Sequence, residues 1–181
     1  MPPKPWKTLT SREVYRNRWI RVREDTAELP NGHTTLYGVV TIGECVGVLP
    51  FVDDDHVLMV RQYRYVVAEN QRWEMPTGGM YAEEQPEDAA QRELMEEVGY
   101  RAGRLVPVST FYSSKSVVDE TAHVFLGYDL IPEARPADDT EQLEVAVLPF
   151  LEVLDMVARS EIRDAMTVIA VLHAARLRAI Q

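Results

Sequence analysis

Residues 78–100, GGMYAEEQPEDAAQRELMEEVGY, contain a short predicted helix crowded with acidic side chains. Glu93 and Glu97 lie four residues apart on one helix face, where like charges repel by about 0.2–0.5 kcal/mol. Ala90 and Leu94 fall on the same side, which indicates that this side faces protein. Partly buried carboxylates without partners are costly. The pattern therefore suggests a bound cation, and magnesium or manganese, hard ions with oxygen ligands, would suit it.

Local signals mark both ends of this helix. Pro86 suits the first helical turn, the acidic residues after it suit the positive end, and Gly99 suits the stop. The simpler interpretation of the charges is a solvated helix in which Arg92 and Glu96 form an ordinary ion pair. The charges alone favour a solvated helix, whereas the spacing of the whole segment favours a metal-binding one.

The fixed positions of the segment follow a known spacing. Gly78, five residues, Glu84 and seven residues precede RELMEEVGY at 92–100. This spacing resembles the signature of the Nudix hydrolases, and only Tyr100 departs from it, where an aliphatic residue is usual. The resemblance covers most of the chain from about Cys45 onward. It implies an α/β fold, a Nudix-type α/β/α sandwich with a mixed sheet, and hydrolysis of a nucleoside diphosphate linked to another moiety.

The resemblance also implies a metal site. Glu93 and Glu97 would be the principal ligands, and the backbone carbonyl near Thr77–Gly78 would be a neutral one. Glu96 would ligate directly or through water. Divalent ions neutralise and orient a pyrophosphate and lower the pKa of a bound water. We therefore expect Mg²⁺ as the cofactor, with Mn²⁺ as a substitute.

The remaining catalytic roles are positioning and proton transfer. By the resemblance, Arg92 holds Glu84 or Glu96 in place rather than touching substrate. The general base is expected in the acidic loop before the last predicted strand, where Glu141 is the first choice and Asp139 the alternative. A general base must come within hydrogen-bond reach of the attacking water.

Segments upstream of the signature indicate a branch of the family. RQYR (61–64) and WEMPTGG (73–79) resemble the ADP-ribose and nucleoside diphosphate sugar pyrophosphatases. By this analogy Arg61 would contact phosphate or ribose, and Glu74 would help bind the nucleoside. The serine-rich segment around Ser114 lacks the proline and glycine common in ADP-ribose enzymes, and Ser114 is our candidate for a flexible hydrogen bond to a sugar or phosphate. We therefore expect tolerance of several sugars, and products that are a nucleoside monophosphate and a sugar phosphate.

Two alternatives stay open. The first is that the chain is a Nudix hydrolase of another branch, which acts on dinucleoside polyphosphates or nucleoside triphosphates. A non-catalytic module that senses a nucleotide should lose signature carboxylates, whereas Glu93, Glu96 and Glu97 are all present.

The alternation of apolar residues in residues 1–42 predicts a separate β segment before a Nudix domain at 43–181. By the resemblance, this segment would make a homodimer whose substrate sites borrow residues from both subunits.

Beyond the signature, apolar runs alternate with polar turns. An Asp-rich turn at 53–55 between two apolar runs favours a hairpin. Two helices are expected near 149–158 and 161–179. An apolar stripe on the second should face the core, and its members are Met166, Ile169, Leu172 and Leu177.

Composition limits the classes of partner. The chain has 181 residues, 46% of them hydrophobic, and a formal net charge of −10 from 19 Lys+Arg against 29 Asp+Glu. An acidic chain argues against a nucleic-acid polymer as the main partner. Cys45 is the sole cysteine, which excludes an intramolecular disulfide. The sequence shows neither a signal peptide nor a window apolar enough for a membrane span, so a cytoplasmic protein without a membrane partner is expected.

Overall fold

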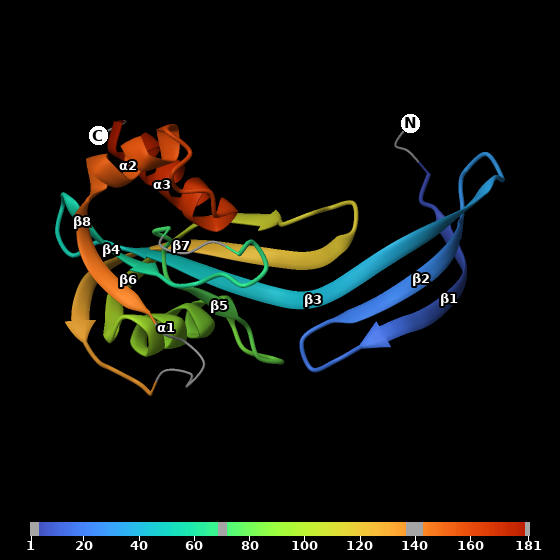
Figure 1. The fold of residues 1–181 in the computed structure, drawn as a ribbon, viewed down its shortest axis with the longest axis horizontal. Coiled ribbons are helices and arrows are strands. Elements are labelled where there is room, and N and C mark those ends of the chain that lie inside the picture. Colours follow the sequence, from blue (N-terminus) through green and yellow to red (C-terminus); the bar gives the residue numbers. More distant parts are fainter. Residues whose placement is uncertain (1–3, 69–71, 137–142, 180–181) are drawn as a thin grey trace. The chain divides into compact units, whose positions relative to one another are not determined.

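The computed structural model describes residues 4–68, 72–136 and 143–179 (Figure 1). The chain divides into two compact units. The N-terminal unit holds the described residues up to Gly43 together with Tyr112–Thr121, and the larger unit holds Glu44–Phe111 and the described residues from Ala122 onward. The domain prediction of 1–42 and 43–181 stays a prediction; this division by contacts places Gly43 and Tyr112–Thr121 with the N-terminal unit.

The N-terminal unit is built on an antiparallel meander. Strands β1 (Lys7–Arg16) and β2 (Arg21–Glu28) pair along their length, and β2 pairs with the first part of β3 (Thr34–Pro50). All ten residues of β1 are exposed. Asp25 and Ala27 are the buried residues of β2. This sheet therefore buries little apolar surface of its own.

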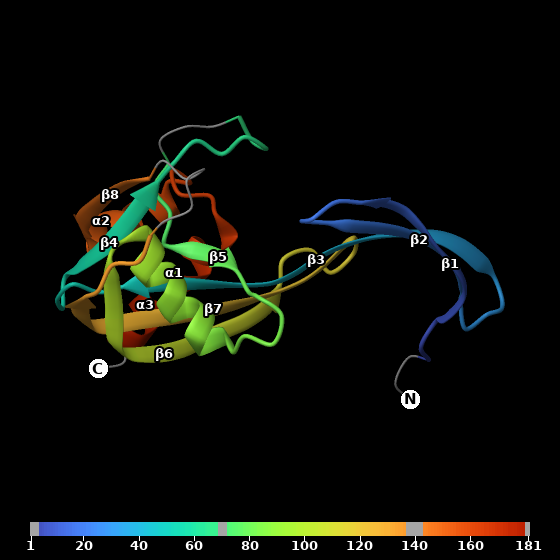
Figure 2. The same cartoon turned by 90° about the horizontal axis from the view of Figure 1, so that it is seen from below.

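Among its described residues, the larger unit combines part of a six-stranded sheet and a two-stranded sheet with three helices, which are drawn in Figures 1 and 2. The second part of β3 pairs with β5 (Thr77–Gly79) and lies beside β7 (Val118–Pro132), which in turn lies beside β6 (Tyr100–Tyr112). Strands β4 (His56–Arg61) and β8 (Glu144–Pro149) form a separate antiparallel pair. The helices are α1 (Pro86–Glu97), α2 (Phe150–Ala158) and α3 (Ala165–Ala179).

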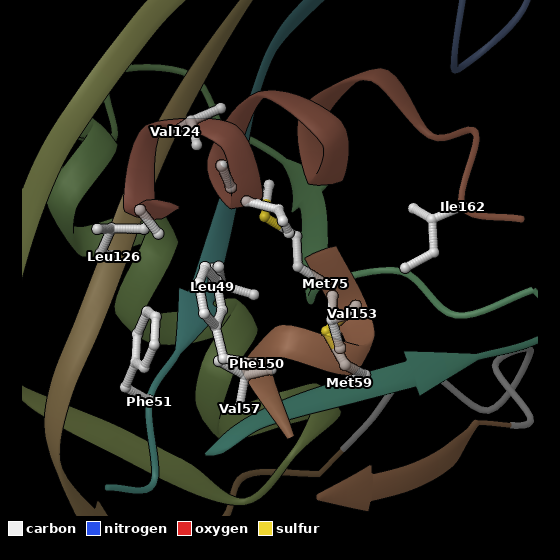
Figure 3. Close-up of a cluster of buried hydrophobic side chains, with 13 residues drawn as sticks. Leu49, Phe51, Val57, Met59, Met75, Val124, Leu126, Phe150, Val153 and Ile162 are labelled. Carbon is white, nitrogen blue, oxygen red and sulfur yellow. The ribbon is translucent and has the colours of Figure 1, made fainter. Parts of the chain in front are cut away.

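Alternation along β3 builds a core on each face of the main sheet. Val46 and Val48 point to one side and pack with Ala90 and Leu94 of α1. Leu49 belongs to the opposite cluster, which includes residues of α2 and α3 and is drawn in Figure 3. Because successive strand residues point to opposite faces, one strand serves both clusters. Helices therefore cover both faces of a sheet, and the predicted α/β/α sandwich with a small N-terminal β segment is confirmed.

Helix α3 differs from its prediction in length and in its buried face. It begins at Ala165 rather than at 161. Leu172 and Leu177 of the predicted stripe are 51% and 44% exposed. The buried residues are instead Thr167, Ala170, Val171 and Ala174. Met166 of the predicted stripe does pack against the core, so the apolar stripe identified only part of the buried face. Within the described residues, no helix is both long and apolar enough to cross a membrane.

Candidate active site

The site begins where β5 passes close to α1. A Cβ atom added at Gly78 would lie 2.0 Å from the carboxyl carbon of Glu93. Real Cβ atoms essentially never approach so closely, so a side chain at 78 would displace the Glu93 carboxylate. Glycine at this position therefore allows the β5 backbone to lie directly against an acidic side chain of the helix.

Two signature carboxylates are buried on α1. Glu93 is 8% exposed and Glu97 is 6% exposed, while Leu94 beside them is fully buried. The helical spacing that sets Glu93 and Glu97 on one side follows from 3.6 residues per turn. The side of α1 that carries Leu94 faces protein, as expected. Glu93 and Glu97, which were expected at the edge of this side, are buried with it.

Arg92 connects the signature carboxylates with the β5 loop. Its Nε and Nη2 donate to the two oxygens of Glu84 at 2.9 and 3.0 Å. Its Nη1 donates to Oε1 of Glu93 at 2.6 Å and to Oε2 of Glu96 at 3.2 Å. A second Nη2 bond reaches the carbonyl oxygen of Gly79 at 2.8 Å. One guanidinium thus bonds three carboxylates, and the predicted role of Arg92 in holding them for catalysis stays a prediction.

These contacts shift the protonation of both partners. Hydrogen bonds from Arg92 lower the pKa of the Glu84 carboxyl, and burial opposes this change. The same bond to Glu84 raises the pKa of Arg92, against the opposing effect of burial. Both groups are therefore charged throughout the physiological range, which keeps the network intact near pH 7.

The donor set fits a hard divalent ion in its chemistry. Glu93 and Glu97 have buried carboxylate groups, and the β5 backbone at Gly78 lies directly against Glu93. Magnesium prefers oxygen ligands and is usually held by one or two carboxylates. Among the residues that the structure describes, no three His, Cys, Asp or Glu side chains form a ready-made metal cluster.

A cavity of about 800 Å³ adjoins this corner of the larger unit. Thr77 and Gly78 line it, and so does Cys45 on the neighbouring strand β3. Glu74 lines it from the loop before β5, and Arg163 and Asp164 line it from the segment before α3. The cavity therefore joins the predicted substrate residue Glu74 to the predicted metal-binding loop.

Glu74 is held in the cavity wall by an arginine. Nη2 of Arg64 lies 2.7 Å from Oε1 of Glu74, and Nε of Arg64 also donates to both carboxylate oxygens. The Glu74 residue is 8% exposed. Burial raises the pKa of its carboxyl, Arg64 opposes this, and the negative charge of Asp164 adds to it. A buried carboxylate paired with an arginine is thus kept in the cavity wall.

Arg61 makes different contacts from those expected of a substrate ligand. Its Nε and Nη2 donate to the two carboxylate oxygens of Glu144 at 2.7 and 2.8 Å. Its guanidinium lies 4.6 Å from the ring centroid of Trp73. Arg61 is absent from the described cavity lining, whereas Arg64 of the same RQYR segment is part of it. Arg61 is therefore paired with Glu144 and does not line the cavity.

The structure tests neither Ser114 nor the predicted general base as a site residue. Ser114 belongs to the N-terminal unit, where its carbonyl accepts hydrogen bonds from the N–H groups of Val117 and Val118 at 3.2 and 3.0 Å. Glu141 and its alternative Asp139 lie outside the described residues. Their predicted roles stay predictions.

Sequence reasoning missed several cavity residues. Arg64 is the last residue of the RQYR segment that indicated the family branch, so that segment offered a signal for Arg64 as well as for Arg61. Arg163 and Asp164 come from a region read only as helix, and no local pattern singles them out. Side-chain oxygen Oδ2 of Asp164 accepts bonds from the N–H and the hydroxyl of Thr167, both at 2.7 Å, which places it at the start of α3.

Comparison with known proteins gives consistent matches over both parts of the chain. Residues 42–167 match the NUDIX domain, and residues 6–40 match the nucleoside diphosphate sugar hydrolase N-terminal domain. An ADP-ribose pyrophosphatase of Bacillus subtilis (strain 168) is 33% identical over 97% of this chain and 95% of its own length. A methanol dehydrogenase activator of Bacillus methanolicus is 30% identical over 92% of this chain and 91% of its own length.

A solved structure agrees on the fold. The crystal structure of an ADP compounds hydrolase superposes with a TM-score of 0.89 at 24% identity, covering 100% of this chain and 98% of that one. The chain belongs to the Nudix hydrolase family, as the spacing of residues 78–100 predicted. Within the family it is an enzyme of the ADP-ribose and nucleoside diphosphate sugar pyrophosphatase branch.

Proposed function

We propose that this enzyme hydrolyses the pyrophosphate bond of nucleoside diphosphate sugars, ADP-ribose among them, with magnesium as cofactor. The observation that carries the proposal is the pair of buried carboxylates on α1, Glu93 and Glu97, together with the close approach of Glu93 to Gly78, which lines the cavity of about 800 Å³. The similarity to an ADP-ribose pyrophosphatase over nearly the whole chain supports the substrate class.

The roles of the signature residues follow from their contacts. Glu93 and Glu97, with a backbone carbonyl at Thr77 or Gly78, would hold the ion, and Glu96 would assist directly or through water. A bound divalent ion supplies charge neutralisation on the diphosphate and a water of lowered pKa. Arg92 orients the carboxylates, and Glu84 orients Arg92. We assign the general base to Glu141, with Asp139 as the alternative.

The cavity wall supports a ligand with groups on both sides of a diphosphate. Arg64 offers a guanidinium suited to phosphate, and Glu74 offers a carboxylate suited to hydroxyl or amino groups. Tyr63 and Tyr65 also line the cavity and are 56% and 86% exposed. We expect their rings to provide an apolar surface for a base. Arg61 joins this set if substrate displaces Glu144, and Ser114 remains our candidate for a sugar contact.

Assembly as a homodimer is part of the proposal. The ten exposed residues of β1 carry Val14 and Tyr15 at 53% and 52% exposure, and Trp19 just beyond β1 is 63% exposed. Large apolar side chains gathered on one small unit are typical of an interaction surface. A second copy of the chain is the partner that the branch resemblance implies.

Product analysis tests the substrate class. The enzyme should be incubated with magnesium and ADP-ribose, ADP-glucose or GDP-mannose, and the products identified by mass spectrometry. We expect a nucleoside monophosphate and a sugar phosphate from more than one substrate. Cleavage of only nucleoside triphosphates or diadenosine polyphosphates would overturn the branch-level substrate and leave the family intact. Tight nucleotide binding without turnover would favour the sensing module.

A further inference from the structure

The hydrogen-bonding capacity of Arg92 is fully used in the plane of its guanidinium. An arginine has five N–H donors in a planar fork, and Arg92 donates five hydrogen bonds, to three carboxylates and one carbonyl. Further restraint on the group must therefore come from above or below that plane.

Tyr81 supplies a contact on one face of this plane. The guanidinium carbon of Arg92 lies 4.2 Å from the centroid of the Tyr81 ring. The backbone N–H of Tyr81 donates to Oε2 of Glu84 at 2.9 Å, and its carbonyl accepts from the N–H of Glu84 at 3.2 Å. Tyr81 thus contacts Arg92 with its ring and the partner of Arg92 with its backbone.

We propose that Tyr81 is a positioning residue of the active site, which fixes the guanidinium of Arg92 and thereby the carboxylates of Glu93 and Glu96. The inference rests on the proposed function for the role of those carboxylates. Tyr81 lies in the five-residue gap between Gly78 and Glu84, outside the fixed positions of the signature. The ring is therefore a feature of this chain rather than a requirement of the family's spacing.

The physical basis is alignment. Hydrogen bonds weaken steeply as their angle departs from linearity. A tilt of the Arg92 plane would loosen the bonds to Glu84, Glu93 and Glu96 together, because all three depend on one rigid group. A cation over an aromatic face resists such a tilt. Tyr81 is 65% exposed, so the contact is an exposed one, and we expect a two- to fivefold effect, roughly the range for such contacts.

Two substitutions separate the ring from the hydroxyl. Tyr81→Phe keeps the aromatic face, and Tyr81→Leu removes it. Affinity for Mn²⁺ should be measured by electron paramagnetic resonance on nucleotide-free protein. We expect the Leu variant to bind Mn²⁺ about two- to fivefold more weakly and the Phe variant to match the wild type. Turnover at saturating metal should change less than the metal concentration needed for half-maximal turnover.

A matched control tests whether any lost cation–π contact has the same effect. Arg104 lies 4.1 Å from the ring centroid of Tyr128, whose ring also stacks with Phe51. Tyr128→Leu should lower the melting temperature and leave Mn²⁺ affinity unchanged. Equal loss of Mn²⁺ affinity in both Leu variants would reduce Tyr81 to a general stabilising role and overturn the proposal.

A second readout is independent of metal and substrate. The Arg92 side-chain N–H resonances should carry a ring-current shift from Tyr81, retained in Tyr81→Phe and lost in Tyr81→Leu. An Arg92 spectrum and an Mn²⁺ affinity that are both unchanged in Tyr81→Leu would overturn the positioning role. Absence of turnover in the wild type would instead overturn the proposed function, while the ring-current result would still report on Tyr81 and Arg92.

Discussion

Glu97 carries its negative charge inside a helix face that also holds Glu93. We predict that Glu97→Gln loses most magnesium-dependent turnover, because a metal ligand is replaced by a neutral amide, while the fold is kept. Without metal, relief of like-charge repulsion should leave stability equal to the wild type or higher by about 0.2–0.5 kcal/mol. Turnover and urea unfolding measure the two effects. Glu87→Gln on the exposed first turn of α1 is the control and should retain activity.

The carboxylates bound to Arg92 should give stability that depends on pH. The pKa of Glu84 is lowered in the fold by hydrogen bonds from Arg92, so its contribution is present above its unfolded pKa and is lost as pH falls through the folded pKa. Arg92→Lys keeps the charge and loses the planar fork. We predict that the variant is less stable than the wild type at pH 7 and that the gap narrows near pH 3. A gap equal at both pH values would exclude this coupling.

The contribution of Glu74 to stability should change with pH in the opposite direction to that of Glu84. Burial raises the pKa of its carboxyl in the fold, so ionisation becomes unfavourable for folding as pH rises through the unfolded and then the folded value. Glu74→Gln cannot ionise. We therefore predict that its melting temperature, relative to the wild type, is higher at pH 7 than at pH 3.5. A difference independent of pH would show that the Arg64 pair fully compensates the burial of Glu74.

At the scale of elements, the ends of a helix were easier to predict from the sequence than the face that it buries. The bounds of α1 were predicted from Pro86 and Gly99, because proline at the start and glycine after the end act through backbone geometry alone. The buried face of α3 was predicted only in part, because packing against other elements selects that face. Met166 packs against the core, while Leu172 and Leu177 are exposed. Strand β4 ends at Arg61, and the residues that follow it, 62–67, line the cavity. The contacts of Arg61 and Arg64 depend on tertiary neighbours that RQYR does not encode.

The end of α1 offers a test of the backbone argument. Gly99 has a φ of +74°, a conformation that L residues rarely adopt, and a Cβ atom added there would lie 3.7 Å from its nearest neighbour, the Cβ of Ala134. Gly99→Ala should therefore cost about 1–2 kcal/mol of unfolding free energy through backbone strain, without a clash. Gly38→Ala in β3, where nothing lies within 4 Å and φ is ordinary, is the matched control. Equal effects of the two changes would contradict the strain explanation.

At the scale of the whole molecule, the exposed strand β1 requires a partner if the dimer proposal holds. The protein should then sediment near twice its mass of 20.6 kDa. Deleting residues 1–42 should reduce both dimerisation and turnover, because each site would lose residues from the partner copy. Sedimentation and activity should be measured on the same preparations. A monomeric truncation with full activity would show that the N-terminal strands are dispensable for catalysis.

The most direct test of metal-dependent pyrophosphate hydrolysis is turnover of ADP-ribose in ¹⁸O-labelled water with magnesium, followed by mass spectrometry of the products. We predict AMP and ribose phosphate, with one ¹⁸O atom on a phosphate group of one of them, and no products when a chelator removes the metal. Formation of ADP and unphosphorylated ribose would place the cleavage at a sugar–phosphate bond and contradict the assignment. Undiminished turnover in the chelator would contradict the role of the buried carboxylates Glu93 and Glu97.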